Sequence, residues 1–291
     1  MLIKTKSPRF FKYIKWRVEK QKNFLCTTIG ETGGGKTYTD LKAMEILNPD
    51  KTPKEIIKNV AFTPIEFLDR LNSGELQKGD CLTWDECGIG LSAKEWQSVS
   101  NKLINYVLQT FRHLNLIVFF NTPSFSFIDA SSRRLFHSIW ITMGINYTTN
   151  KCEVKPLLLQ TDPKKGKIYF KFLRSDDEKH GLIPVKRIYF SLPSKELRNL
   201  YETKKQAFTT KLNKSIYEEL QEVEAKRGRK KELTEHQQHI LDLLNKGYTT
   251  TQISKQYKVT PRAIRGSIAS IKKKVGMEAF KPSKPLKTPK I

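Results

Sequence analysis

The stretch Gly30-Glu31-Thr32-Gly33-Gly34-Gly35-Lys36-Thr37 decides the fold of this chain. It matches the G-x-x-x-x-G-K-[ST] phosphate-binding loop at every fixed position. Residues 23–29 before it are typical of a short buried strand, and residues 37–47 after it carry apolar side chains at helical spacing. A flexible glycine-rich turn can match the same pattern by chance. The strand and the helix on either side favour a nucleotide-binding loop.

The residue types of this loop suit a nucleotide phosphate. Glycines let backbone N–H groups turn toward phosphate oxygens, and the N-terminus of the following helix adds partial positive charge. We expect Lys36 to reach the β- and γ-phosphates as a catalytic residue, and the Thr37 hydroxyl to ligate Mg²⁺. The ATP-binding residues predicted here are Gly30, Glu31, Thr32, Gly33, Gly34, Gly35, Lys36, Thr37 and Tyr38. The sequence offers no motif that separates ATP from GTP.

Two acidic residues follow a second apolar run, Cys81-Leu82-Thr83-Trp84. Asp85 and Glu86 at the end of that run resemble a Walker B element, and enough chain separates them from Thr37 for a helix, a strand and another helix. We expect Asp85 to hold Mg²⁺, directly or through water, and Glu86 to act as the general base on the attacking water. Acidic residues commonly end strands, so this pair gains its meaning from the phosphate-binding loop.

A polar side chain ends a third apolar run. Residues 116–120 are continuously apolar, as expected of a strand that is covered on both faces. Asn121 at its tip can sense the γ-phosphate or orient the water, which makes it a candidate catalytic residue. The alternative is that Asn121 satisfies the turn before Pro123.

Three arginines are candidate fingers that reach the nucleotide of a neighbouring subunit. Arg112 ends a helix predicted over residues 97–114, where its charge also suits the helix dipole. Arg133 and Arg134 lie in a segment that is expected to be helical, before a strand predicted over residues 138–143. Solvated surface charge is the alternative for at least one of these two.

The order of these motifs resembles that of an additional-strand P-loop ATPase. The run from Gln109 to Pro123 is similar to the FtsK–HerA group, including the Zot-like ATPases of phages and mobile elements. The resemblance covers about residues 21–145 and implies a RecA-like α/β sheet with helices on both faces, in a motor or assembly ATPase that forms oligomers and acts on DNA. Many members carry Gln where this chain has Asn121. AAA+ ATPases place Asn at that strand tip, so the AAA+ class stays open.

Residues 233–277 predict a small all-α domain. Thr234 and Gly247 suit the ends of a first helix, and Thr260 with Pro261 suits the start of a third. The block is similar, over about residues 233–276, to the helix-turn-helix of LuxR-type and sigma-factor C-terminal domains. The side chains expected in its core are Ile240, Leu241, Leu244, Ile253, Val259, Ile264, Ile268 and Ile271.

The helix-turn-helix resemblance implies that the third helix enters the major groove of duplex DNA. The residues expected to contact bases or phosphates are Thr260, Arg262, Arg265 and Ser267, with Lys272, Lys273 and Lys274 on phosphates. A formal net charge of +24 over 291 residues favours a polyanionic partner, with DNA first and an anionic membrane surface second. A three-helix module that binds protein is the alternative.

Composition divides the rest of the chain. The predicted segments are a basic-aromatic segment (1–20), an ATPase domain (21–205) with antiparallel strands over 152–191, a charged helix or linker (206–232), the helix-turn-helix domain (233–277) and a disordered Lys/Pro tail (278–291). The first segment either touches DNA or a membrane or, as we favour, docks its aromatic side on the ATPase domain. No apolar run has the length of a signal peptide or a membrane span, which predicts a cytoplasmic protein.

These patterns together predict a Mg²⁺-dependent ATP hydrolase that acts on DNA. The preferred role is a motor for DNA translocation, packaging or transfer in a mobile element, built as a homo-oligomer that can close into a ring. The alternative from another class is an ATP-switched regulator of transcription or replication, in which the helix-turn-helix selects one DNA site. A third candidate is an assembly ATPase that works at a membrane surface through the basic-aromatic segment.

Overall fold

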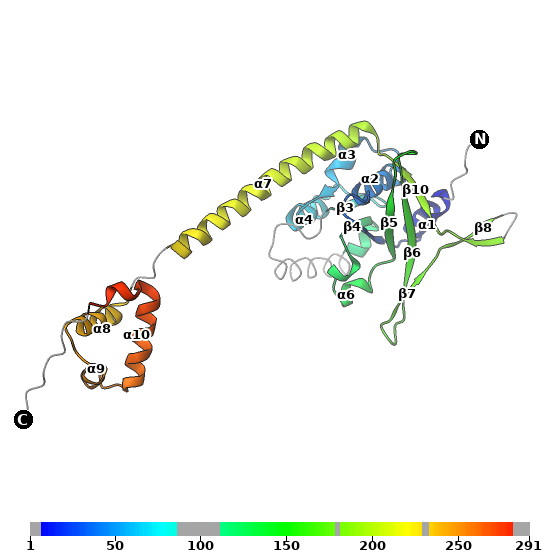
Figure 1. The fold of residues 1–291 in the computed structure, drawn as a ribbon. Helices are drawn as coiled ribbons and strands as arrows, with labels where there is room; N and C mark the ends of the chain where they lie inside the picture. Colours follow the sequence, from blue (N-terminus) through cyan, green and yellow to red (C-terminus); the bar gives the residue numbers. More distant parts are fainter. Residues whose placement is uncertain (1–6, 86–110, 178–180, 229–232, 282–291) are drawn as a thin grey trace, which may run out of the picture. The chain divides into compact units, whose positions relative to one another are not determined.

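The computed structural model describes residues 7–85, 111–177, 181–228 and 233–281, and it divides into two compact units (Figure 1). The first unit extends to Asn213 and holds a large sheet, and the second begins at Lys214. Helix α7, Lys195–Gly228, contributes to both units. Each unit has its own hydrophobic core, so the two are described separately.

A central sheet in the order β10-β6-β5-β1-β4-β3-β2 organises the first unit, with β7 paired to β6. The strands are β1 (Phe24–Ile29), β2 (Val60–Ala61), β3 (Cys81–Trp84), β4 (Ile117–Asn121), β5 (Ser138–Asn146), β6 (Lys151–Thr161), β7 (Ile168–Lys171), β8 (Arg174–Asp177), β9 (Gly181–Pro184) and β10 (Ile188–Ser191). Strands β5, β1, β4, β3 and β2 are parallel neighbours, whereas β6, β7 and β10 extend the β5 edge in antiparallel pairs. Strands β8 and β9 pair separately.

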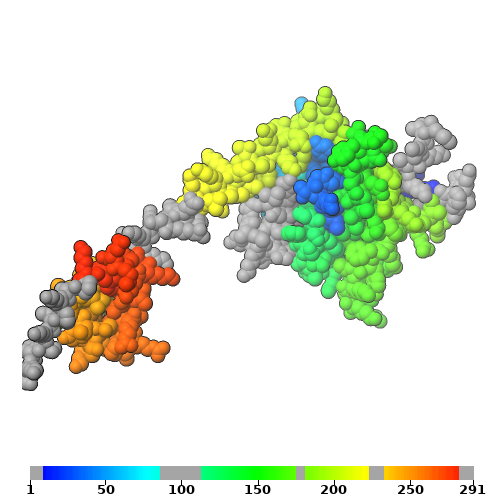
Figure 2. All heavy atoms as spheres, viewed as in Figure 1, coloured from blue at the N-terminus to red at the C-terminus, as the bar shows by residue number. Residues whose placement is uncertain are grey.

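Strand β4 lies between β1 and β3, so the phosphate-binding strand and the acidic strand are not neighbours. The three strands were predicted from sequence, whereas their order in the sheet was not. Strands joined through helices in parallel pairs also confirm the predicted RecA-like α/β class. The antiparallel strands expected over residues 152–191 are present, and the turn between β6 and β7 projects from the unit (Figures 1 and 2).

Helices cover both faces of the sheet. Those of the first unit are α1 (Ser7–Glu19), α2 (Lys36–Leu47), α3 (Pro53–Lys58), α4 (Pro64–Asn72), η1 (Phe111–Leu114), η2 (Phe125–Phe127) and α6 (Ala130–Arg133), with the start of α7. Ile117 and Phe119 of β4 point into the core under α1 and α2, and the alternate residues Val118 and Phe120 point into the core under α4. Burial on both faces explains the unbroken apolar run of this strand.

The basic-aromatic segment docks on the sheet, as we favoured. Phe10, Phe11 and Ile14 of α1 are buried, and both phenylalanine rings meet Trp140 of β5 edge to face, with ring centroids 5.9 and 6.3 Å apart. Trp16 faces outward and is 49% exposed. Helix α1 is therefore part of the core of the first unit.

After the end of α7, the described residues of the second unit form the helices α8 (Glu235–Asn245), α9 (Thr250–Gln256) and α10 (Pro261–Val275), followed by η3 (Met277–Ala279). Thr234, Thr249 and Thr260 cap the three N-termini through their side chains, as sequence predicted for the first and third. The prediction that Val259 is a core residue is wrong, because Val259 lies in the turn after α9 and is 44% exposed. Leu243, which was not predicted, is buried instead.

Helix α7 crosses the boundary that was predicted between the ATPase domain (21–205) and the charged helix or linker (206–232). It continues unbroken to Gly228, because residues 195–227 contain neither glycine nor proline to stop it. Most of the helix predicted over residues 97–114 lies outside the described residues. Residues 111–114, which are described, form η1. Among the described residues, no helix combines the length and apolar character needed to cross a membrane.

Candidate nucleotide-binding site

The phosphate-binding loop connects β1 to α2 and rests on β5 and β6. Gly30 has φ 149°, and a Cβ atom at this position would lie 2.0 Å from Oγ1 of Thr142. Gly35 caps α2 with φ 86°, and a Cβ there would lie 3.0 Å from Sγ of Cys152. Both positions have positive φ, so any other residue would strain the backbone there, and at Gly30 its Cβ would also clash with Thr142. The close approach aims the N-terminus of α2 at the mouth of the loop.

The Lys36 ammonium lies in the mouth of this loop. Its Nζ donates to the carbonyl oxygens of Gly30 and Glu31, at 3.0 and 2.9 Å. Neutral carbonyl groups are weaker acceptors than phosphate oxygens, which are charged. A phosphate oxygen in this mouth would therefore compete well with the two backbone carbonyls for the Lys36 ammonium.

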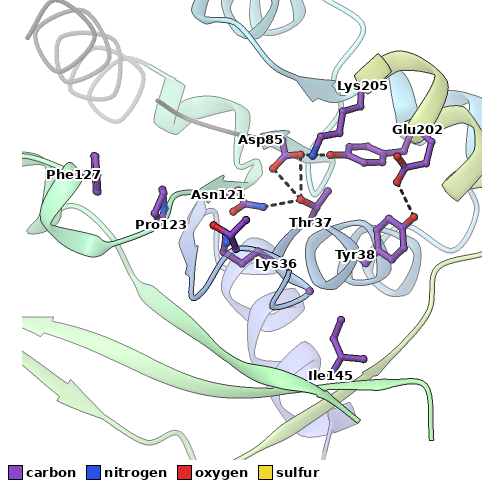
Figure 3. A pocket seen from close by; sticks show the side chains of 14 residues that line it. Lys36, Thr37, Tyr38, Asp85, Asn121, Pro123, Phe127, Ile145, Glu202 and Lys205 are labelled. Atoms are coloured by element: carbon purple, nitrogen blue, oxygen red, sulfur yellow. Dashed lines mark hydrogen bonds between the residues drawn. The ribbon is translucent and has the colours of Figure 1, made fainter. Parts of the chain in front are cut away.

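Polar side chains from three elements converge beside Lys36 (Figure 3). Oγ1 of Thr37 lies 3.2 Å from each carboxylate oxygen of Asp85, and Nδ2 of Asn121 donates to the same Oγ1 at 3.2 Å. Asp85 follows β3 and Asn121 ends β4, so parallel strands carry both side chains to one edge of the sheet. A hydroxyl next to a fully buried carboxylate is a set of oxygens that fits Mg²⁺.

The side chain of Asn121 is directed at Thr37 and not at the turn before Pro123. That turn is served by Thr122, whose hydroxyl donates to the carbonyl of Ser124 at 2.7 Å. Asn121 is 3% exposed and therefore sits at the base of the site. The geometry thus favours the first of the two interpretations drawn from sequence, while the role of Asn121 in sensing phosphate stays a prediction.

Helix α7 supplies residues that sequence reasoning missed. The hydroxyl of Tyr201 donates to Oδ2 of Asp85 at 2.6 Å, and both side chains are buried. The following residue of α7, Glu202, accepts a hydrogen bond from the Tyr38 hydroxyl at 2.8 Å. Lys205, one helical turn further, lies with its ammonium 5.7 Å from the centre of the Tyr201 ring. No sequence motif marks Tyr201, because its partner is 116 residues away and the contact is set by the tertiary fold.

These residues enclose a cavity of about 490 Å³, here called the nucleotide cleft. Its lining residues are Thr32, Gly33, Gly35, Lys36, Thr37, Tyr38, Asp85, Asn121, Pro123, Phe127, Ile145, Tyr201, Glu202 and Lys205. The volume falls in the range typical of small-molecule sites. Gly30, Glu31 and Gly34 of the predicted set contribute to the loop without lining the cleft.

A buried carboxyl group lies beneath the loop. Burial raises the pKa of Asp40 well above its ordinary value, and the nearby Asp85 carboxylate acts in the same direction, whereas the hydrogen bond from Thr28 and the charge of Lys36 oppose the rise. The Thr28 hydroxyl donates to Oδ1 of Asp40 at 2.5 Å. Burial, followed by the hydrogen bond to Glu202, raises the pKa of Tyr38 to about 12.

Two of the remaining predicted catalytic residues, Arg133 and Arg134, are not brought into the cleft. Arg133 donates through Nε to the carbonyl of Ile128 at 2.6 Å, and the Arg134 guanidinium lies against Gly166 in the turn between β6 and β7. Neither lines the nucleotide cleft of its own chain. Glu86 and the side chain of Arg112 lie outside the described residues. An arginine finger therefore stays a prediction.

The second unit presents the predicted DNA-contacting residues along α10. Arg262, Arg265, Lys272 and Lys273 are exposed, and Ser267 and Lys274 are half-buried. The Thr260 hydroxyl accepts from the backbone N–H of Ala263 at 3.3 Å, so its acceptor capacity serves the helix cap. Lys274 donates to Oε1 of Gln237 at 2.6 Å, which ties it to α8. Arg262, Arg265, Lys272 and Lys273 are thus the exposed cations that this helix offers to a partner.

Comparisons with known proteins add little. No protein-family model matches the chain, and a search of curated proteins finds no match. Among solved structures, the chain is similar to the N-terminal domain of zonular occludens toxin from Neisseria meningitidis, at 16% identity and a TM-score of 0.30, over 54% of this chain and 96% of that one. A likeness of this size carries no argument. The P-loop fold is therefore assigned from the strand order and the loop geometry.

Proposed function

We propose that this chain is a Mg²⁺-dependent ATP hydrolase that acts on DNA as a motor for translocation, packaging or transfer. One observation carries the hydrolase assignment. The Thr37 hydroxyl, at the mouth of a glycine-rich loop and next to Lys36, lies 3.2 Å from both the Asp85 carboxylate and the Asn121 amide. A phosphate-binding loop, a metal-binding carboxylate and a polar strand tip are the parts that ATP hydrolysis requires.

Each residue has a distinct task in this proposal. Bound Mg²⁺ would supply charge neutralisation on the phosphoryl oxygens. Lys36 exchanges two backbone carbonyls for the β- and γ-phosphates, and Thr37 and Asp85 hold the metal. Tyr201 keeps one oxygen of Asp85 hydrogen-bonded, which fixes the orientation of the carboxylate. Asn121 orients the attacking water, and Glu86 removes its proton.

The charge of the chain supports action on DNA. The net charge is +24, and α10 exposes Arg262 and Arg265 on a three-helix unit that resembles a helix-turn-helix in sequence. We propose that this unit holds duplex DNA while a homo-oligomer hydrolyses ATP, with Arg112, Arg133 or Arg134 reaching a neighbouring subunit. A sequence-specific, ATP-switched regulator would use the same parts but would turn over slowly and prefer one site.

Metal-dependent nucleotide binding tests the hydrolase assignment. We would titrate wild type, Thr37→Val and Thr37→Ser with a fluorescent ATP analogue, with and without Mg²⁺. Valine has the shape of threonine but lacks the hydroxyl, whereas serine keeps it. The proposal requires Mg²⁺ to strengthen binding in wild type and in Thr37→Ser. In Thr37→Val this enhancement by Mg²⁺ should be about tenfold smaller, a difference of about 1.4 kcal/mol. Equal Mg²⁺ enhancement in all three proteins would remove Thr37 from the metal site.

A further inference from the structure

A second cavity lies on the first unit, away from the nucleotide cleft. Its volume is about 1050 Å³, and it is bounded by α1, β6, β7 and the β8–β9 pair. Arg17 and Tyr13 reach it from α1, Lys171 ends β7, Phe172 follows it, and Arg174 begins β8. We call this the basic-aromatic cavity.

The charge of the basic-aromatic cavity has one sign. Arg17, Lys171 and Arg174 line it, and no Asp or Glu among the described residues does so. Lys171 and Arg174 are exposed, and Arg17 is half-buried and anchored through Nε to the carbonyl of Asn23 at 2.8 Å. Three cations around one recess repel one another, and this arrangement favours an anionic ligand that offsets the repulsion.

Aromatic rings accompany these cations. Tyr13 stacks on Trp16 with centroids 6.0 Å apart and planes 28° apart, and Trp16 is 49% exposed. Phe172 also lines the cavity and is half-buried, with the ammonium of Lys155 5.8 Å from its ring centre. The pattern continues along β7, where Lys167 lies 5.4 Å from the ring of Tyr169, which is 41% exposed.

We propose that the basic-aromatic cavity binds single-stranded DNA, with Arg17, Lys171 and Arg174 on phosphates and with bases stacked on Tyr13 and Phe172. Cations that follow the backbone and rings that stack on bases are the two elements that single-strand binding proteins combine. A duplex keeps its base faces covered and would use the cations alone. The inference deepens and rests on the proposal that this chain acts on DNA, but it does not depend on ATP hydrolysis.

Binding of a labelled oligothymidine of about 15 nucleotides to the full-length chain, without nucleotide, tests the cations. The test variant is Lys171→Gln/Arg174→Gln. The matched control is Lys164→Gln/Lys165→Gln, which removes the same charge from the exposed β6–β7 turn outside the cavity. We expect the test variant to bind about tenfold more weakly, with the slope of log K against log salt smaller by about 1.4, since each phosphate contact on a single strand contributes about 0.7. Equal losses of affinity in both variants would mean that the oligonucleotide binds through general surface charge and not in the cavity, which would overturn the proposal.

Photocrosslinking locates the strand independently of affinity. An oligonucleotide that carries 5-iodouracil is expected to crosslink to peptides that contain Tyr13 or Phe172, and Phe172→Leu is expected to remove the second crosslink. Crosslinks confined to residues 233–277, or full competition by an unlabelled duplex of the same length, would overturn the assignment. Because nucleotide is absent, a chain that fails to hydrolyse ATP but crosslinks at Phe172 would refute the proposed function and leave the cavity assignment standing.

Discussion

The hydrogen bond from Tyr201 to Asp85 offers a direct probe of how α7 supports the nucleotide cleft. The variant Tyr201→Phe removes one hydroxyl and leaves the ring in place. The bond is 2.6 Å long and buried, and its acceptor is a carboxylate. Hydrogen bonds to charged groups contribute about 1.5–3 kcal/mol, so we expect the free energy of unfolding of the first unit to fall by about 2 kcal/mol.

Thermal unfolding measures this loss. For a unit of about 200 residues, about 2 kcal/mol corresponds to a midpoint lower by about 4–8 °C. The control is Tyr38→Phe, which removes an exposed hydrogen bond to Glu202 in the same cleft and is expected to shift the midpoint far less. Addition of Mg²⁺ and ATP should narrow the gap between Tyr201→Phe and wild type, because the metal then satisfies the Asp85 carboxylate. Equal midpoints for both tyrosine variants would refute the supporting role of Tyr201.

Three further outcomes follow from the structure. Because the pKa of Asp40 is raised in the folded chain, the folded chain keeps a proton that the unfolded chain releases, and this group's contribution to stability is lost as pH rises above the unfolded pKa. The unfolding midpoint of Asp40→Asn should therefore rise relative to that of wild type between about pH 5 and pH 8. A constant difference between the two midpoints over this range would contradict the prediction. In urea unfolding, Gly33→Ala should cost about 1 kcal/mol for its positive φ, and Gly30→Ala clearly more, because its Cβ would also meet Thr142; equal costs would argue against the packed loop. Arg262→Ala/Arg265→Ala should weaken random-sequence duplex binding, measured by anisotropy at several salt concentrations, and reduce the salt slope by about 1.8, whereas an unchanged slope would exclude these arginines from phosphate contacts.

Local patterns were enough to predict the framework of this site. The loop ending in Lys36-Thr37 and the apolar strand before Asp85 are short-range signals, and parallel strands bring their carboxyl ends to one edge whatever the intervening chain. The place of β4 between β1 and β3 was not predicted. An apolar run shows that a strand is buried but does not show which strands are its neighbours.

Contacts that depend on the tertiary fold could not be predicted from the sequence. Tyr201 reads as one apolar position in a charged helix, and its contact with Asp85 depends on where α7 crosses the sheet. Asp40 looks like a surface residue of α2, yet it is fully buried because α2 turns this side toward Thr28. In the second unit, Val259 was expected in the core but is exposed, because it lies in a turn where helical periodicity does not set the direction of its side chain. Leu243 is buried although it was not predicted to be.

Steady-state ATP hydrolysis with and without random-sequence duplex DNA tests the central claim most directly, in wild type and in Glu86→Gln. The account predicts strong stimulation by DNA in wild type and its loss in Glu86→Gln, because glutamine cannot remove a proton from the attacking water. Slow hydrolysis that ignores the DNA would contradict the motor, and an ATP-switched regulator would then be the better description of this chain.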